Sequence, residues 1–117
     1  MSRSFKNNNP GNLRFSPWTK SKGAKDDGDG YAIFPTLPTG FKTLGELIDG
    51  NKYSKHSIFE AMRIYAPVKD KNNPDAYAEF IASYAEVDPT DRIMDLTPIE
   101  FFKLLIGIMI FEGWSDA

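Results

Sequence analysis

Apolar side chains from residue 39 onwards recur with the spacing of helices. Intervals of three and four residues, the period of an amphipathic helix, separate Phe41, Leu44, Leu47 and Ile48. Gly50 interrupts this pattern, so we predict a helix over residues 38–49.

Two further helices are predicted from their capping residues. Ser57 and Glu60 have the spacing of a capping box, which starts a helix that we expect to run to about Tyr65. Asn73 places an N-cap ahead of Pro74, a proline at the first helical position. The buried stripe predicted for this helix consists of Tyr77, Phe80, Ile81 and Tyr84.

The last predicted helix is apolar on nearly all of its faces. Thr97 and Glu100 form a second capping box, with Pro98 at the first helical position. The residues 98–113 include ten large apolar side chains, so we expect the helix to lie in the middle of the core. Its apolar stretch, 104–111, is shorter than the roughly 20 residues that span a bilayer, and we expect no membrane insertion.

The N-terminal third has the composition of loops. Residues 7–30 are rich in Asn, Gly, Pro, Ser, Lys and Asp, and predict an ordered loop and a short hairpin rather than helix. Residues 28–31 supply a turn before a short strand at 31–34, which Pro35 ends. A helical turn near residues 90–94 is a further expectation. The predicted fold class is therefore α+β, mainly α: one domain, residues 1–117, with a small β-hairpin region followed by four helices.

Composition excludes several classes of function. The chain has 14 basic and 16 acidic residues in 117, so its charge does not favour nucleic acid as a partner. Cysteine is absent, which excludes disulfides, a thiol nucleophile and a thiolate metal site. The first residues lack the apolar core of a signal peptide. We therefore expect synthesis in the cytoplasm and a route to any extracellular target other than conventional secretion.

Glu112 is the first candidate for chemistry. It stands where the apolar helix ends, and both desolvation and the negative end of the helix dipole are expected to raise the pKa of its carboxyl group. A carboxylic acid that stays protonated near neutral pH can donate a proton to a glycosidic bond. The alternative is that Glu112 projects into solvent, with Gly113 as the C-cap of the helix.

Other candidates lie in the polar N-terminal third and beside the second helix. The asparagines of residues 7–12 suit the hydroxyl and acetamido groups of sugars, but they can equally tie a loop to its own backbone. The acidic stretch 26–30 lacks the ligand spacing of an EF-hand, so it forms either a solvated turn or a second carboxylate facing Glu112. Tyr65 is either a core residue or part of a groove, and His56, the only histidine, is read as an exposed loop residue.

Taken together, these motifs resemble the lysozyme-like superfamily of peptidoglycan glycosidases, in a circularly permuted order. The phrase Glu112-Gly-Trp114 is similar to the family's catalytic phrase, but it stands at the end of the chain. The segment that should follow that phrase resembles Asn8-Asn-Pro-Gly-Asn-Leu-Arg14, near the beginning. Trp18, then Gly30-Tyr-Ala-Ile-Phe34 and a helix from about Gly40 follow in the family order, and Tyr65-Ala-Pro67 is similar in place to a motif beside the transglycosylase cleft. Permutation requires the two chain ends to meet, and we expect them to do so beside one cleft with Glu112 at its floor.

The resemblance implies a muramidase-like glycoside hydrolase, glucosaminidase or lytic transglycosylase that cuts the glycan strand of peptidoglycan. It implies Glu112 as the catalytic acid, with Asp27 or Asp29 stabilising the transition state or positioning water. The substrate-binding residues that it implies are Asn8, Asn9, Asn12, Trp18, Tyr31, Tyr65 and Trp114. No metal or cofactor is required.

The chain departs from the family pattern at two points. Gly113 stands where the family has serine, and the hairpin carries aspartates but no glutamate. The permuted order is similar to that of small muramidase-like proteins of phage virions, so components of a virion or of a secretion apparatus are expected partners. The alternative function is a non-catalytic peptidoglycan-binding or virion structural module of the same fold.

Overall fold

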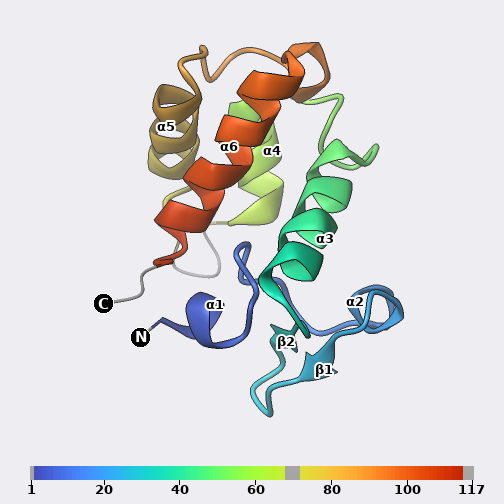
Figure 1. Cartoon of the computed structure of the whole chain (residues 1–117). Helices are drawn as coiled ribbons and strands as arrows, with labels where there is room; N and C mark the ends of the chain where they lie inside the picture. The colour runs from blue at the N-terminus through green and yellow to red at the C-terminus, as the bar shows by residue number, and fades with distance from the viewer. Residues whose placement is uncertain (1, 68–71, 115–117) are drawn as a thin grey trace. The chain divides into compact units, whose positions relative to one another are not determined.

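A computed structural model describes residues 2–67 and 72–114 of the chain. Among these residues it contains six α-helices and one two-stranded antiparallel sheet, which confirms a mainly helical protein with a small β-hairpin (Figure 1). The chain divides into two compact units, residues 1–46 with 108–117 and residues 47–107. Helices α3 (Leu37–Asp49) and α6 (Pro98–Phe111) each contribute to both units.

The first unit holds the short elements of the N-terminal third. They are α1 (Arg3–Lys6), α2 (Pro17–Ser21), β1 (Lys25–Asp26) and β2 (Ala32–Ile33). In the sheet Lys25 lies opposite Ile33 and Asp26 opposite Ala32, and an isolated bridge joins Arg14 to Tyr31. The predicted strand at 31–34 is thus confirmed as the second arm of a hairpin.

Helix α2 corrects the expectation of loop and hairpin over residues 7–30, and α1 is a further helix that lies before this range. The side chain of Ser2 accepts a hydrogen bond from the backbone N–H of Phe5 and so caps α1. Ser16 and Thr19 form a capping box for α2, with Pro17 at the first helical position. The Ser-Pro pair is the same signal that predicts the helix at Asn73-Pro74. Helices of four or five residues are too short for a periodic apolar pattern, so capping was the only local sign of them.

The second unit is built from helices whose predicted starts are confirmed. It contains α4 (Ile58–Tyr65), α5 (Pro74–Ala85), the 3-10 turn η2 (Ile93–Asp95) and parts of α3 and α6. Ser57 and Glu60 exchange both bonds of a capping box, and the side chain of Asn73 accepts from the backbone N–H of Ala76. Thr97 and Glu100 likewise bond reciprocally, at 2.8 and 3.2 Å.

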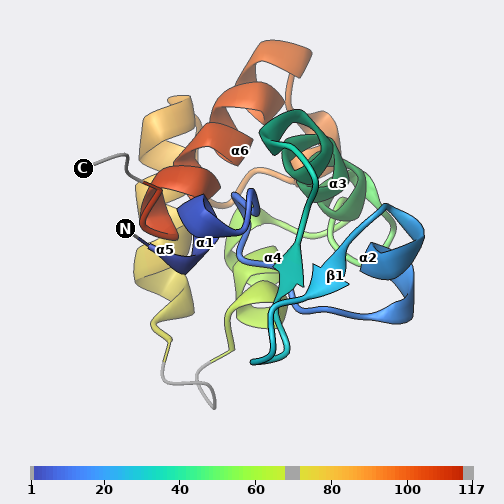
Figure 2. The same cartoon turned by 60° about the horizontal axis from the view of Figure 1, so that its bottom comes forward.

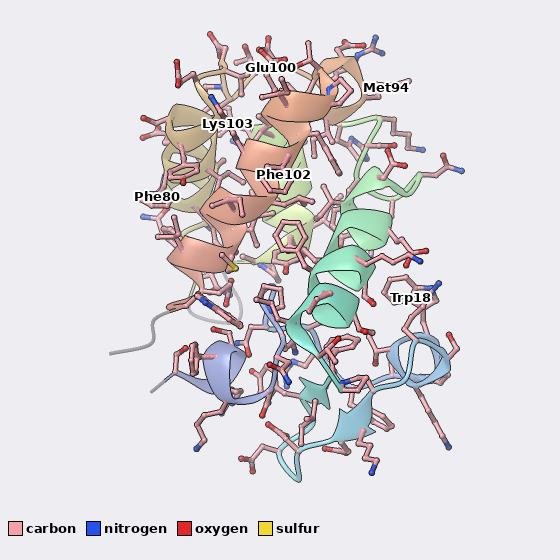
Figure 3. The ribbon with its side chains drawn as sticks, viewed as in Figure 1. Trp18, Phe80, Met94, Glu100, Phe102 and Lys103 are labelled. Atoms are coloured by element: carbon pink, nitrogen blue, oxygen red, sulfur yellow. The ribbon has the colours of Figure 1, made fainter. Side chains whose placement is uncertain are left out.

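The buried faces of α5 and α6 differ from the prediction. Phe80 and Tyr84 are exposed, and the buried face of α5 consists of Tyr77, Ala78, Ile81, Ala82 and Ala85. Helix α6 is not surrounded by core, because Ile99 and Phe102 are 70% and 55% exposed. Phe80 and Phe102 point outward in Figure 3.

Helices α5 and α6 approach each other closely at one point. A Cβ atom on Gly107 of α6 would lie 3.2 Å from Cα of Ile81 on α5. Small residues let helix backbones come near one another. Around this contact Ile81, Leu104 and Ile108 are buried, so each helix has one face of large apolar residues in the core and others on the surface.

The capping box of α4 gives a stability prediction. We expect Ser57→Ala to lower the free energy of unfolding by about 1 kcal/mol, because the backbone N–H of Glu60 loses its acceptor. Urea denaturation followed by circular dichroism measures the change. Ser83→Ala, at an exposed position within α5, is the matched control and should change stability little. Equal losses in both variants would contradict a capping role.

Candidate functional site

Glu112 directly follows α6 in a Schellman motif. Its backbone N–H donates to the carbonyl of Ile108 at 2.9 Å, and the N–H groups of Gly113 and Trp114 donate to Ile110 and Met109 at 3.0 and 3.1 Å. Gly113 has φ +87°, a left-handed conformation that favours glycine. The role of Gly113 as C-cap is confirmed. Glu112 itself is half-buried.

The two ends of the described chain meet at this point. The hydroxyl of Ser4 in α1 donates to the carbonyl oxygen of Glu112 at 3.2 Å. The rings of Phe5 and Trp114 lie 5.0 Å apart between centroids, at an interplanar angle of 54°. Figures 1 and 2 both show α1 beside the end of α6. The expected meeting of the ends is confirmed for residues 2–5 and 112–114, whereas a cleft floored by Glu112 stays a prediction.

The asparagines of the N-terminal loop divide into different roles. Asn9 is fully buried: its Nδ2 donates to the carbonyls of Leu13 and Ala32, each at 2.9 Å, and its Oδ1 accepts from the N–H of Leu13 at 2.9 Å. We therefore correct the assignment of Asn9 as a sugar contact, since its side chain supports the loop from within. This burial depends on a contact with β2, which is distant from Asn9 in the sequence.

Asn8 and Asn12 are half-buried. Both have left-handed backbones, with φ 51° and 50°, which asparagine tolerates better than most residues. Nδ2 of Asn8 donates to the carbonyl of Phe34 at 3.2 Å. Within the described part of the chain, Oδ1 of Asn12 is buried and has no hydrogen-bond partner. Half-buried positions in a tight loop are compatible with sugar contacts for these two residues.

Asp27 is the anchor of the hairpin turn. Its Oδ1 accepts from the backbone N–H groups of Asp29 and Tyr31 at 2.8 and 3.1 Å, and its Oδ2 accepts from Nδ2 of Asn7 at 3.0 Å. Nε of Arg3 lies 4.0 Å from the same Oδ2. The hydrogen bond from Asp29, followed by the other contacts, holds the pKa of Asp27 below its ordinary value. The carboxylate stays ionised with both oxygens engaged, while Asp29 is exposed on the turn.

This lowered pKa predicts a pH dependence of stability. The group stabilises the fold fully above the ordinary aspartate pKa of 3.8, and that contribution is lost as the pH falls through the lower value of the folded state. We expect wild type to melt above Asp27→Asn at pH 7, with the difference shrinking below about pH 4. Thermal melts between pH 7 and 2.5 measure it. Asp29→Asn is the control, and a constant difference for Asp27→Asn across the range would contradict the assignment.

The aromatic candidates lie in both units. In the first unit Trp18 is exposed on α2 with Nζ of Lys22 5.5 Å from its ring centroid, and Trp114 packs on Phe5. In the second unit Tyr65 meets the ring of Tyr53 at 6.0 Å and that of Tyr77 at 6.2 Å, both edge-on. These ring contacts favour the core role for Tyr65 over a place in a groove.

Tyr31 is the centre of a cluster that the sequence patterns did not reveal. Cζ of Arg3 lies 3.9 Å from its ring centroid and Cζ of Arg14 lies 4.4 Å from it. The ring is half-buried, and both arginines are exposed. The pairing of Arg14 with Tyr31 is an isolated bridge outside the hairpin, so the positions of both arginines depend on the fold.

A scan against protein-family models found no match to this chain, and a search of curated proteins found none. Within residues 2–67 and 72–114, no helix has the length and apolar character to cross a membrane. The same described residues contain no cluster of three or more metal-ligating histidine, aspartate or glutamate side chains. Proposals about function therefore rest on the residues and contacts of the first unit.

Proposed function

We propose that this chain is a peptidoglycan-degrading glycosidase of the muramidase type, a circularly permuted relative of the lysozyme-like enzymes. The observation that carries the proposal is the contact between Ser4 and Glu112. It brings the Glu112-Gly-Trp114 phrase to α1, which directly precedes the asparagine segment, and the permuted order requires these two parts of the chain to lie close together. The same compact unit contains Asn8, Asn12, Trp18 and Tyr31.

Glu112 is the proposed general acid. Its place at the carbonyl end of an apolar helix, close to the first residues of the chain, is what supports this role. The carboxylic acid donates its proton to the glycosidic oxygen as the bond to the anomeric carbon breaks. The resulting carboxylate then removes a proton from the attacking oxygen as the new bond to that carbon forms.

The hydrogen bonds that the Asp27 carboxylate accepts favour a reaction in which Glu112 acts without a second carboxylate. Each oxygen of Asp27 already accepts a hydrogen bond, so attack of Asp27 on a sugar carbon would dismantle the hairpin turn. A hydroxyl of the substrate itself is then the favoured nucleophile, which produces an anhydro sugar, the outcome of a lytic transglycosylase. The exposed carboxylate of Asp29 is the alternative group for positioning water.

Digestion of purified bacterial sacculi tests the proposal. We expect the protein to lower the turbidity of a sacculus suspension and to release soluble glycan fragments that mass spectrometry identifies. Fragments that end in an anhydro sugar support the single-carboxylate route, whereas reducing ends indicate hydrolysis. Sacculi that are bound without any fragment release would support the non-catalytic module instead.

A further inference from the structure

Two arginines lie against the ring of Tyr31, but only one of them faces a carboxylate. Arg3 faces the carboxylate of Asp27 at 4.0 Å and has a side chain that is 44% exposed. Arg14 takes part in none of the ion pairs formed among the described residues, although it lies against the same ring. Two guanidinium groups therefore share one aromatic ring, and only that of Arg3 faces a carboxylate.

Stacking on the ring prepares Arg14 for a planar anion. A guanidinium that lies over an aromatic face keeps its N–H donors in its own plane, where they can pair with both oxygens of a carboxylate. The isolated bridge between Arg14 and Tyr31 holds the backbone of the arginine beside that of the tyrosine. Less side-chain freedom is then lost when a ligand binds.

We propose that Arg14, supported by Tyr31 and assisted by Arg3, binds a carboxylate of the substrate. This inference rests on the proposed function, because it assigns the ligand as a carboxylate of the peptide side chains that peptidoglycan carries. Arg14 belongs to the same compact unit as Glu112. Such a contact distinguishes peptidoglycan from neutral glycans built on the same sugars and makes Arg14 a specificity-determining residue.

Two forms of one polymer test the proposal. Native peptidoglycan is compared with the same peptidoglycan after its carboxylates have been converted to amides with a carbodiimide and ammonia. Binding is measured by co-sedimentation in the Glu112→Gln background, which avoids cleavage during the experiment. We expect Arg14→Gln to weaken binding to native polymer by about fivefold to tenfold, the effect of losing one exposed charge-assisted pair. Binding of Arg14→Gln to the amidated polymer should equal that of the parent.

Arg92→Gln is the matched control, because it removes one positive charge from a surface pair with Asp95 in the other unit. It should bind both polymers as the parent does, and Arg14→Lys should recover only part of the lost affinity. Equal weakening of Arg14→Gln on both polymers, or no weakening on native polymer, would overturn the carboxylate assignment. Neither result affects the proposed function if wild type still releases glycan fragments, whereas absence of both binding and release overturns the two together.

Discussion

Replacing Glu112 by glutamine is expected to lower the release of glycan fragments by about 10²- to 10⁴-fold, the contribution of a positioned general acid. Glutamine keeps the size of the side chain but has no acidic proton for the leaving oxygen. The hydrogen bond that joins the ends of the chain uses the backbone carbonyl of residue 112, so it survives the substitution. A loss of activity without a lower melting temperature would therefore reflect chemistry rather than folding.

The measurement compares wild type and Glu112→Gln in the sacculus assay, with thermal melts of both proteins. Glu79→Gln is the control, since Glu79 is an exposed glutamate in the middle of α5. It should retain wild-type activity. Undiminished fragment release by Glu112→Gln would exclude Glu112 as the acid. If Glu112→Gln lost activity and also melted well below wild type, the loss would be assigned to the fold.

Gly40→Ala is expected to destabilise the protein by about 3 kcal/mol or more, beyond the range of an ordinary surface substitution. A Cβ atom on Gly40 would overlap the carbonyl oxygen of Asn8 and lie 3.1 Å from Cδ of Pro10. The loop cannot retreat easily, because Asn8 is held in a left-handed conformation and Asn9 is buried with three hydrogen bonds. The start of α3 thus lies directly against the asparagine segment.

Guanidinium denaturation of Gly40→Ala measures this loss. Lys42→Ala, at an exposed position on the same helix, separates steric overlap from any general effect of alanine and should shift the midpoint little. A Gly40→Ala protein within about 1 kcal/mol of wild type would show that the asparagine loop yields to the methyl group, which contradicts the rigid packing described above.

Local signals predicted the long helices well. Each capping box or N-cap acts over three or four residues, so Ser57, Asn73 and Thr97 specify the starts of their helices without reference to the rest of the molecule. The same holds for the turn at residues 26–30, where carboxylates bind nearby backbone N–H groups. Helices α1 and α2 were missed because their capping signals were not followed by an apolar period.

Which side chains of a helix are buried depended on the elements that pack against that helix. The spacing of Phe80 and Tyr84 matches a buried stripe, but the buried face of α5 carries Tyr77, Ile81 and alanines instead, with Ile81 against Gly107. Likewise, ten large apolar side chains between 98 and 113 predicted a fully buried helix, and the fold leaves Ile99 and Phe102 exposed. Periodicity identifies an amphipathic helix but does not say which neighbour covers it.

The sequence by itself determined the boundaries of the four longer helices, the hairpin turn and the presence of Glu112 where an apolar helix ends, because these features depend on residues a few positions apart. Only the tertiary structure decided that Asn9 is buried, that Asp27 is bound on both oxygens, and that Arg3 and Arg14 meet at Tyr31. The contact between Ser4 and Glu112 joins residues 108 positions apart. Such contacts form only when the packed elements bring distant segments together, so no local pattern specifies them.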